Sequence, residues 1–203
     1  MKPARIFLVT GTDTGVGKTV FAAAATISLR QQGRRVVALK PVCSGGRDDA
    51  RLLHAAAGKV LSLNEVNPWH FRAPLSPLLA ARKERKRVPL QQVAAHVRGL
   101  AKQFEVVIVE GAGGLLSPLG EDFDSRDLMR ALNAIPIVVC PNKLGAVNQV
   151  RLVLDALPKR VARQAIVVLM AQPKPDTASR GNLQLLQEFS EPARIRTFPW
   201  LGR

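Results

Sequence analysis

The stretch VTGTDTGVGKTV, close to the N-terminus, contains the residue types that bind phosphate groups. Gly11, Gly15 and Gly17 let the backbone turn its N–H groups inward, and a helix N-terminus should follow. Lys18 could then reach the β- and γ-phosphates of a nucleotide, and the Thr19 hydroxyl could bind Mg²⁺. An apolar run, three glycines, GKT and a helix together favour a nucleotide-binding loop over a purely structural turn.

The loop departs from the strict pattern G-x-x-x-x-G-K-[ST] in two ways. Thr12 stands where the pattern requires glycine, and the glycine comes one residue early, as Gly11. An acid, Asp13, also lies in a loop that should hold anions.

Three further groups of residues could complete a phosphate and metal site. Lys40, in KPVCSGG, would be a second cation pointing into the same crevice, and Ser44 adds a hydroxyl in a flexible glycine turn. Glu110 ends the very apolar run VVIVE, where an unpaired buried carboxylate would be costly, so a metal is a sensible partner. Asp48 and Asp49 are either acids at a helix N-terminus or, one of them, a Mg²⁺ ligand.

Strand and helix patterns alternate along the chain and position these residues. The apolar runs predict strands at 5–10, 35–40, 104–114, 136–141, 165–171 and 194–198. The helical stripes, acids and glycine stops predict helices at 18–31, 48–58, 89–101, 145–157 and 179–190, with Asp124 and Asp127 at a further helix start. Residues 59–77 contain three prolines and are predicted to be irregular.

This alternation predicts the α/β class, with a parallel sheet covered by helices on both faces. In such sheets ligands bind outside the carboxyl ends of the strands. Those ends are TGTDTGVGKT, KPVCSGG, EGAGG, CPNKLG and MAQPKP. We expect residues 1–203 to form a single domain with its site at this edge.

The composition excludes several classes of protein. Hydrophobic residues make up 47% of the chain, which is too many for a disordered protein. No apolar run is long enough to predict a membrane span. The two cysteines, Cys43 and Cys140, lie far apart and in no CxxC motif. This pattern is typical of a reduced, cytoplasmic protein without a disulfide framework or a zinc site.

The net charge is strongly positive. Thirty Lys and Arg residues stand against fifteen Asp and Glu, which gives +15 at pH 7. Such an excess attracts polyanions, so a nucleic-acid surface is one interpretation, and a solvated basic face is the other. The absence of tyrosine and an aromatic content of 4% leave no set of stacking platforms for a single strand.

The motifs GTDTGVGKT, KPVCSGG, VEGAGGLLSPL, NKLGAVNQ and FPWL, in this order, resemble those of the dethiobiotin synthetase family. The resemblance spans nearly the whole chain. It implies a three-layer P-loop NTPase fold with a mainly parallel central sheet flanked by helices, and a homodimer. It also implies an ATP-dependent ligase, in which Mg-ATP and CO₂ close a cyclic urea on 7,8-diaminopelargonate through a carbamate and a carbamic–phosphoric anhydride.

The resemblance also implies residue roles. The positions that match the family's carbamate, phosphate and catalytic site are Thr14, Lys18, Lys40 and Ser44. The positions that match its Mg²⁺ ligands are Thr19, Asp49 and Glu110. The implied nucleotide-binding residues are Gly11, Thr12, Asp13, Gly15, Val16, Gly17, Lys18, Thr19, Val20, Gln172, Pro199, Trp200 and Leu201. The implied substrate-binding residues are Thr14, Lys40, Ser44, Gly111, Gly145, Ala146, Val147 and Asn148, the last four across the dimer interface.

Two positions distinguish this chain. Many family members read adenine with an asparagine where this chain has Gln172, so the preferred base is open. Asp13 stands where partition ATPases that bind DNA carry the signature lysine of KGG-x-GK[ST], which argues against that alternative, although the charge of +15 favours it. We hypothesise that the Asp13 carboxylate organises the loop or orients a substrate ammonium. A related ligase acting on another diamine or amide substrate remains a third interpretation.

Overall fold

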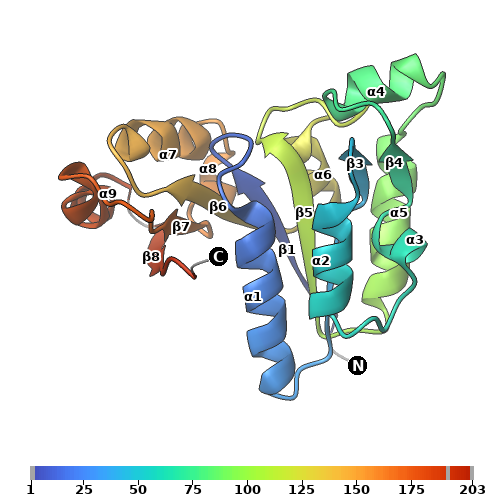
Figure 1. The fold of residues 1–203 in the computed structure, drawn as a ribbon, viewed down its shortest axis with the longest axis horizontal. Coiled ribbons are helices and arrows are strands. Elements are labelled where there is room, and N and C mark those ends of the chain that lie inside the picture. The colour runs from blue at the N-terminus through green and yellow to red at the C-terminus, as the bar shows by residue number, and fades with distance from the viewer. Residues whose placement is uncertain (1–2, 191–192, 202–203) are drawn as a thin grey trace.

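The structure is a computed structural model that describes residues 3–190 and 193–201. Its centre is a six-stranded sheet with the strand order β2-β5-β1-β6-β7-β8, and each neighbouring pair is parallel (Figure 1). The strands are β1 (Arg5–Gly11), β2 (Val36–Leu39), β5 (Val106–Gly114), β6 (Ile135–Pro141), β7 (Ile166–Met170) and β8 (Arg194–Phe198). All six predicted strands are confirmed, as is the parallel sheet.

Helices cover both faces of this sheet and make three layers. On one face, α1 (Lys18–Gln31) packs with α2 (Asp48–Ala56) over the middle strands. The other face is covered by α5 (Leu90–Ala101), α6 (Ser125–Leu132), α7 (Ala146–Asp155) and α9 (Asn182–Phe189). Because successive strand residues point to opposite faces, Leu8 packs into one of these layers and Val9 into the other.

The strand register brings the functional segments together. In the pairing of β1 with β5, Val9 lies opposite Glu110, and the pairing of β1 with β6 sets Gly11 opposite Val139. The strands run in the same direction, so the loops that leave their carboxyl ends meet at one edge. This edge holds the loop that follows β1.

The prediction that residues 59–77 are irregular was wrong. This segment contains α3 (Leu63–Val66) and β4 (Trp69–Phe71), and its last residue begins α4 (Pro77–Lys83). β4 pairs in parallel with β3 (Val42–Ser44) in a separate two-stranded sheet. The prolines misled the prediction because Pro77 begins a helix, where its missing N–H costs nothing.

Other differences are smaller. The short α8 (Lys159–Ala162) and the 3₁₀ turn η1 (Ala178–Arg180) were not predicted, because one turn carries no periodicity. The last two predicted helices begin later than expected, at Ala146 and Asn182. The predicted helix start is confirmed, since Asp124 and Asp127 form a capping box at α6. Among the described residues no helix is long and apolar enough to cross a membrane.

Candidate functional site

The loop between β1 and α1 is folded as a phosphate-binding loop would be. Gly15 and Gly17 have φ angles of 72° and 96°, a region that side chains with a Cβ rarely adopt. Gly17 caps α1, so the first N–H groups of that helix point toward the loop. The backbone N–H of Thr12 donates to the Val139 carbonyl at 3.0 Å and fixes the loop to β6. The predicted sequence of strand, loop and helix is therefore present.

Asp13 and Lys18 hold the loop together from within. The Asp13 carboxylate accepts a hydrogen bond from the Thr14 N–H at 2.6 Å, and the Asp13 carbonyl accepts one from Lys18 Nζ at 2.8 Å. These contacts support the hypothesis that Asp13 organises the loop. The alternative half of that hypothesis, a contact with a substrate ammonium, stays a prediction.

Four residues from different elements form a group that we call the charge cluster: Lys18, Lys40, Asp49 and Glu110. Lys40 Nζ contacts Glu110 Oε1 at 2.5 Å and Asp49 Oδ2 at 3.0 Å. Glu110 also accepts a hydrogen bond from the Thr19 hydroxyl at 2.9 Å. The Lys40 and Glu110 side chains are 5% and 1% exposed. The start of α1, α2 and β5 thus bring all three predicted metal ligands together beside the buried Lys40, which follows β2.

Burial and opposite charges shift the ionisation of the cluster in different directions. Burial, assisted by the Lys40 charge, lowers the pKa of Lys18. Burial also acts to lower the pKa of Lys40, but the Glu110 and Asp49 carboxylates outweigh it and raise that pKa. For Glu110, burial outweighs the attraction of Lys40 and raises the pKa of the carboxyl. The Oε2 atom of this carboxyl is buried with no hydrogen-bond partner among the described residues.

Asp49 and its neighbour Asp48 have different surroundings. Burial acts to raise the pKa of the Asp49 carboxyl, but Lys40 and hydrogen bonds hold it below its ordinary value. The Asp48 side chain is 89% exposed and pairs with Arg51 on the surface. Of the two acids, only Asp49 reaches the charge cluster. Within the described residues no group of three or more His, Cys, Asp or Glu side chains could hold a metal ion.

Ser44 and Gly111 lie in packed rather than open surroundings. Ser44 was predicted to lie in a flexible glycine turn, but it ends β3, and its hydroxyl donates to the Leu75 carbonyl at 2.5 Å. That expectation was wrong because β4 supplies a pairing strand. Gly111 is buried, and a Cβ there would lie 2.6 Å from Ser125 Oγ. Close approach of α6 to β5 therefore requires glycine at this position.

A cavity of about 490 Å³ adjoins the phosphate-binding loop. Its walls come from the start of the loop (Gly11 to Asp13), from the end of β5 and the segment after it (Gly114 to Pro118), and from Leu152, Val153 and Ala156 at and just after the end of α7. The Thr14 hydroxyl also faces this region, since it lies 3.8 Å from where a Gly113 Cβ would be. The loop and the end of β5 thus share one hollow.

Segments that follow β6 and β7 are joined by hydrogen bonds from asparagines. Asn182, buried at the start of α9, donates from Nδ2 to Asn142 Oδ1 at 2.9 Å and to the Lys143 carbonyl at 3.0 Å. Asn142 in turn donates from Nδ2 to the Ser179 carbonyl at 3.0 Å. These bonds tie the loop between β6 and α7 to the chain after β7.

The Asp176 carboxylate adds a further hydrogen bond between the segments that follow β6 and β7. Asp176 accepts hydrogen bonds from the Leu144 N–H at 2.7 Å and the Ser179 N–H at 2.8 Å. We call the four side chains the polar clasp: Asn142, Asp176, Ser179 and Asn182. Leu144, whose N–H the clasp binds, immediately precedes Gly145, which caps α7 with a φ of 89°. The first N–H groups of α7 are thereby presented at a fixed place.

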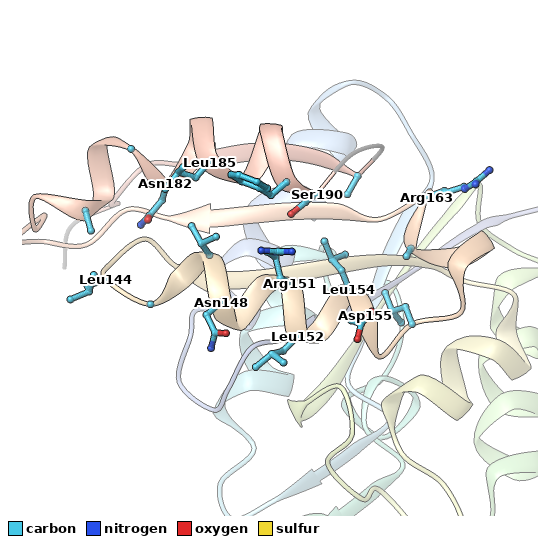
Figure 2. A pocket seen from close by; sticks show the side chains of 18 of the residues that line it. Leu144, Asn148, Arg151, Leu152, Leu154, Asp155, Arg163, Asn182, Leu185 and Ser190 are labelled. Atoms are coloured by element: carbon cyan, nitrogen blue, oxygen red, sulfur yellow. The ribbon is translucent and has the colours of Figure 1, made fainter.

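A groove of about 1140 Å³ lies between α7, α8 and α9, on the side of α7 that faces α9 (Figure 2). Figure 2 shows Arg151 and Leu154 pointing toward α9, while Asn148 and Leu152 point the other way. The Arg151 guanidinium lies 5.6 Å from the centre of the Phe189 ring. No residue of the charge cluster lines this groove. The groove and the phosphate-binding loop are therefore separate features.

Comparison with known proteins decides the family. Residues 5–203 match a family described as an AAA domain. The chain is 38% identical to an ATP-dependent dethiobiotin synthetase from Akkermansia muciniphila, with 92% of this chain and 88% of the relative covered. It is also 38% identical to one from Anaeromyxobacter dehalogenans, with 97% and 90% covered. This chain belongs to the dethiobiotin synthetase family. A more distant member from Bacillus licheniformis is 34% identical, with 90% and 80% covered.

Solved structures agree with the fold of this dethiobiotin synthetase family member. The signal recognition particle receptor FtsY from Elizabethkingia anophelis superimposes with a TM-score of 0.57 at 18% identity, over all of this chain. FtsY from Thermotoga maritima gives 0.54 at 16% identity. This chain spans about 60% of the length of those chains. At such identity the likeness concerns the fold alone.

The residues predicted to bind the nucleotide lie in and beside the phosphate-binding loop, after β7 and after β8. Val16 is buried beside the sheet, and Val20 is half-exposed on α1. Pro199, Trp200 and Leu201 follow β8, and Phe198 packs edge-to-face on Phe21 of α1, with ring centres 5.7 Å apart. Gln172 donates from its side-chain amide to the Met170 carbonyl at 2.9 Å. The segment after β8 thus begins beside the helix that follows the phosphate-binding loop.

The polar clasp was missed by sequence reasoning. The NKLG segment was recognised as the end of a strand, but no hydrogen-bond partner for its asparagine, Asn142, was predicted. The side chains that complete the clasp lie more than thirty residues later, in a stretch without a motif. No spacing rule connects such positions, and only the three-dimensional structure does.

Proposed function

We propose that this protein is an ATP-dependent dethiobiotin synthetase, which joins CO₂ to the two amines of 7,8-diaminopelargonate and closes a cyclic urea. The observation that carries the proposal is the charge cluster, with its buried Lys40–Glu110 pair, beside a phosphate-binding loop in a chain that matches dethiobiotin synthetases over about nine-tenths of its length. A reaction between anionic groups needs such cations. It needs no nucleophilic side chain from the protein.

The proposed reaction has three balanced steps. One amine adds to CO₂ and loses a proton, which gives a carbamate. A carbamate oxygen then attacks the γ-phosphorus of ATP and releases ADP, which leaves a carbamic–phosphoric anhydride. The second amine attacks the carbonyl carbon, expels phosphate and loses a proton as the ring closes.

The cations bring two anions, the carbamate and the γ-phosphate, into contact. Lys18 lies at the start of α1 and Lys40 lies after β2, so both face the loop from different elements. Fixed positive groups at the place where negative charge meets lower the barrier without reorganisation at the moment of reaction. We assign carbamate and phosphate binding to these lysines together with Thr14 and Ser44. Ser44 must exchange its bond to Leu75 to take part.

The residues beside the loop fit a magnesium ion. Two carboxylates and a hydroxyl converge there, and all are oxygen ligands of the kind that Mg²⁺ prefers. The buried Oε2 of Glu110, unpartnered in the described part of the chain, is the kind of atom that a cation would satisfy. We assign Mg²⁺ to Thr19, Asp49 and Glu110. When bound, it would neutralise charge on the transferring phosphates.

The remaining substrate groups are assigned to the ends of β6, β7 and β8. The N-terminus of α7, Gly145 to Asn148, is suited to a carboxylate, because its N–H groups lack partners within the helix. We assign the carboxylate of 7,8-diaminopelargonate to this segment of the second subunit in a homodimer. The nucleotide base is assigned to Gln172 and to Pro199, Trp200 and Leu201. The two cysteines, which form no disulfide in the described residues, fit a reducing cytoplasm.

A product assay tests the proposal. Purified protein is incubated with 7,8-diaminopelargonate, bicarbonate and Mg²⁺ with either ATP or CTP, and dethiobiotin is measured by mass spectrometry. We expect dethiobiotin and one phosphate per ring with at least one nucleotide, and none with Lys40→Ala. A protein that binds nucleotide but forms no dethiobiotin would overturn the proposal. If product appears only with another diamine, the protein is a related ligase. Salt-sensitive DNA binding without product would favour a partition-type ATPase.

A further inference from the structure

Lys18 and Lys40 are held in different ways, although both belong to the charge cluster. Lys18 donates to a backbone carbonyl of its own loop, that of Asp13. Lys40 contacts no backbone oxygen through its ammonium group in the described residues and is held by two carboxylates, those of Asp49 and Glu110. The carboxylates that hold Lys40 are the same ones that fit a magnesium ion.

The ammonium of Lys40 and a divalent cation therefore compete for the negative charge of the same two carboxylates. Glu110 Oε1 already accepts from Lys40 at 2.5 Å and from the Thr19 hydroxyl at 2.9 Å. Asp49 Oδ2 is bonded to the same ammonium. Two positive ions at these two carboxylates would repel each other, and the buried Lys40 and Glu110 side chains are little screened by water, although Asp49 is half-exposed. The arrival of one cation therefore favours the departure of the other.

The local structure allows the Lys40 side chain to move while its backbone stays fixed. The Lys40 N–H donates to the Val66 carbonyl at 3.0 Å, and the Lys40 carbonyl accepts from Asn67 Nδ2 at 2.7 Å. Asn67 is itself buried and is bonded to Arg47, so this anchor is firm. The four-carbon stem of a lysine can rotate, and its ammonium is a compact charge without fixed direction. Only the side chain has to change.

We propose that Lys40 is a built-in counter-ion of the metal site: its ammonium neutralises Asp49 and Glu110 in the absence of Mg²⁺, and the ion that arrives with the nucleotide displaces it. The displaced ammonium is then available to the anionic substrates beside the loop. Metal binding and the movement of the Lys40 ammonium toward the substrates then occur together. The inference rests on the proposed metal site but not on the identity of the diamine.

A titration with metal alone tests this. Mn²⁺ binding is followed by electron paramagnetic resonance without nucleotide, in the wild type and in Lys40→Met, which keeps the length of the side chain but removes its charge. We expect Lys40→Met to bind one Mn²⁺ about tenfold or more tightly than the wild type, because no ammonium has to leave. Lys40→Arg, which keeps the charge, and Lys143→Met, at an exposed lysine, should bind as the wild type does.

Thermal unfolding gives a second readout. In EDTA, Lys40→Met should melt below the wild type, because two carboxylates lose their counter-ion, and millimolar Mg²⁺ should restore it. Mg²⁺ alone should leave the melting temperature of the wild type unchanged. The double variant Lys40→Met/Glu110→Gln should recover stability in EDTA and lose the tight Mn²⁺ site.

Several results would overturn the proposal. One is equal Mn²⁺ affinity in Lys40→Met and the wild type, and another is tight binding in Lys40→Arg. A Lys40→Met protein that stays unfolded with Mg²⁺, while the double variant folds, would also overturn it, because metal could then not replace the ammonium. These titrations contain no diamine. Their outcome therefore does not depend on whether the protein forms dethiobiotin.

Discussion

The charge cluster and the polar clasp hold two parts of one proposed active site by different physical means. The cluster uses full charges from α1, α2, β5 and the residue after β2, and its Lys40–Glu110 pair is buried. The clasp uses amides and one exposed acid to tie the loop after β6 to the segment after β7. In the charge cluster a large desolvation cost opposes a large electrostatic attraction, whereas each hydrogen bond of the clasp contributes only a small free energy. Chemistry on phosphates needs the first, and placement of a loop needs only the second.

The largest effect should come from breaking the ion pair within the cluster. Glu110→Ala leaves the buried Lys40 ammonium with one carboxylate, and removal of one partner of a buried pair costs about 3–5 kcal/mol. Unfolding in urea measures this loss. The control is Asp48→Ala, which removes an acid whose side chain is 89% exposed, and should change stability by less than about 0.5 kcal/mol. Similar losses in both variants would contradict the distinction between buried and exposed pairs.

The next largest effect concerns turnover. Lys18→Ala removes a cation that we propose binds the transferring phosphate, so dethiobiotin formation should fall by about 10²–10³-fold or more. Folding should be preserved, because its ammonium is bonded to only one carbonyl. Lys102→Ala removes an exposed cation just after α5, away from the groove and the loop, and turnover should be unchanged. Equal losses in the two variants would show that overall charge, rather than the loop lysine, drives the reaction.

The cluster and the clasp also differ in how far sequence could predict them. The phosphate-binding loop was predicted residue by residue, because GTDTGVGKT is a local pattern with a local mechanism. Glu110 was predicted from its place at the end of an apolar strand. Its partner Lys40 lies seventy residues away, so only the sheet order shows that the two touch.

The parts that could not be predicted depend on contacts between distant segments. Ser44 was expected in an open turn, but a strand more than twenty residues later pairs with it. That strand lies in a proline-containing stretch, and a prediction based on proline as a breaker overlooks it. The clasp is likewise made by side chains that carry no motif. Nothing in the sequence distinguishes these two asparagines, one aspartate and one serine, and only the fold brings them together.

A moderate effect is expected from the clasp. Asn182→Ala leaves Asn142 Oδ1 and the Lys143 carbonyl without their donor, which costs about 1–3 kcal/mol when such groups are buried. We expect the KM for 7,8-diaminopelargonate to rise about tenfold, with a smaller change in kcat, because the start of α7 is displaced. The control is Gln187→Ala, at an exposed site on the same helix. A fall in kcat at unchanged KM would place the clasp in the chemical step instead.

The smallest effect is a dependence on pH. The Leu144 N–H, followed by those of Ser179, holds the pKa of the Asp176 carboxyl below its ordinary value of 3.8. A lowered pKa in the folded protein means that the stabilisation is fully present above pH 3.8 and is lost as the pH falls through the folded value. The Leu144 amide resonance should therefore titrate below pH 3.8 in an NMR series. A midpoint above 3.8 would contradict the hydrogen bond.

The central claim is that the charge cluster directs the γ-phosphate to a carbamate oxygen and not to water. Bicarbonate labelled with ¹⁸O tests it in the complete reaction, with the phosphate product analysed by mass spectrometry. If the carbamate attacks phosphorus, one labelled oxygen leaves with the phosphate and another remains in the ring carbonyl. Labelled dethiobiotin with unlabelled phosphate would contradict the claim, because the phosphoryl group would then have gone to water.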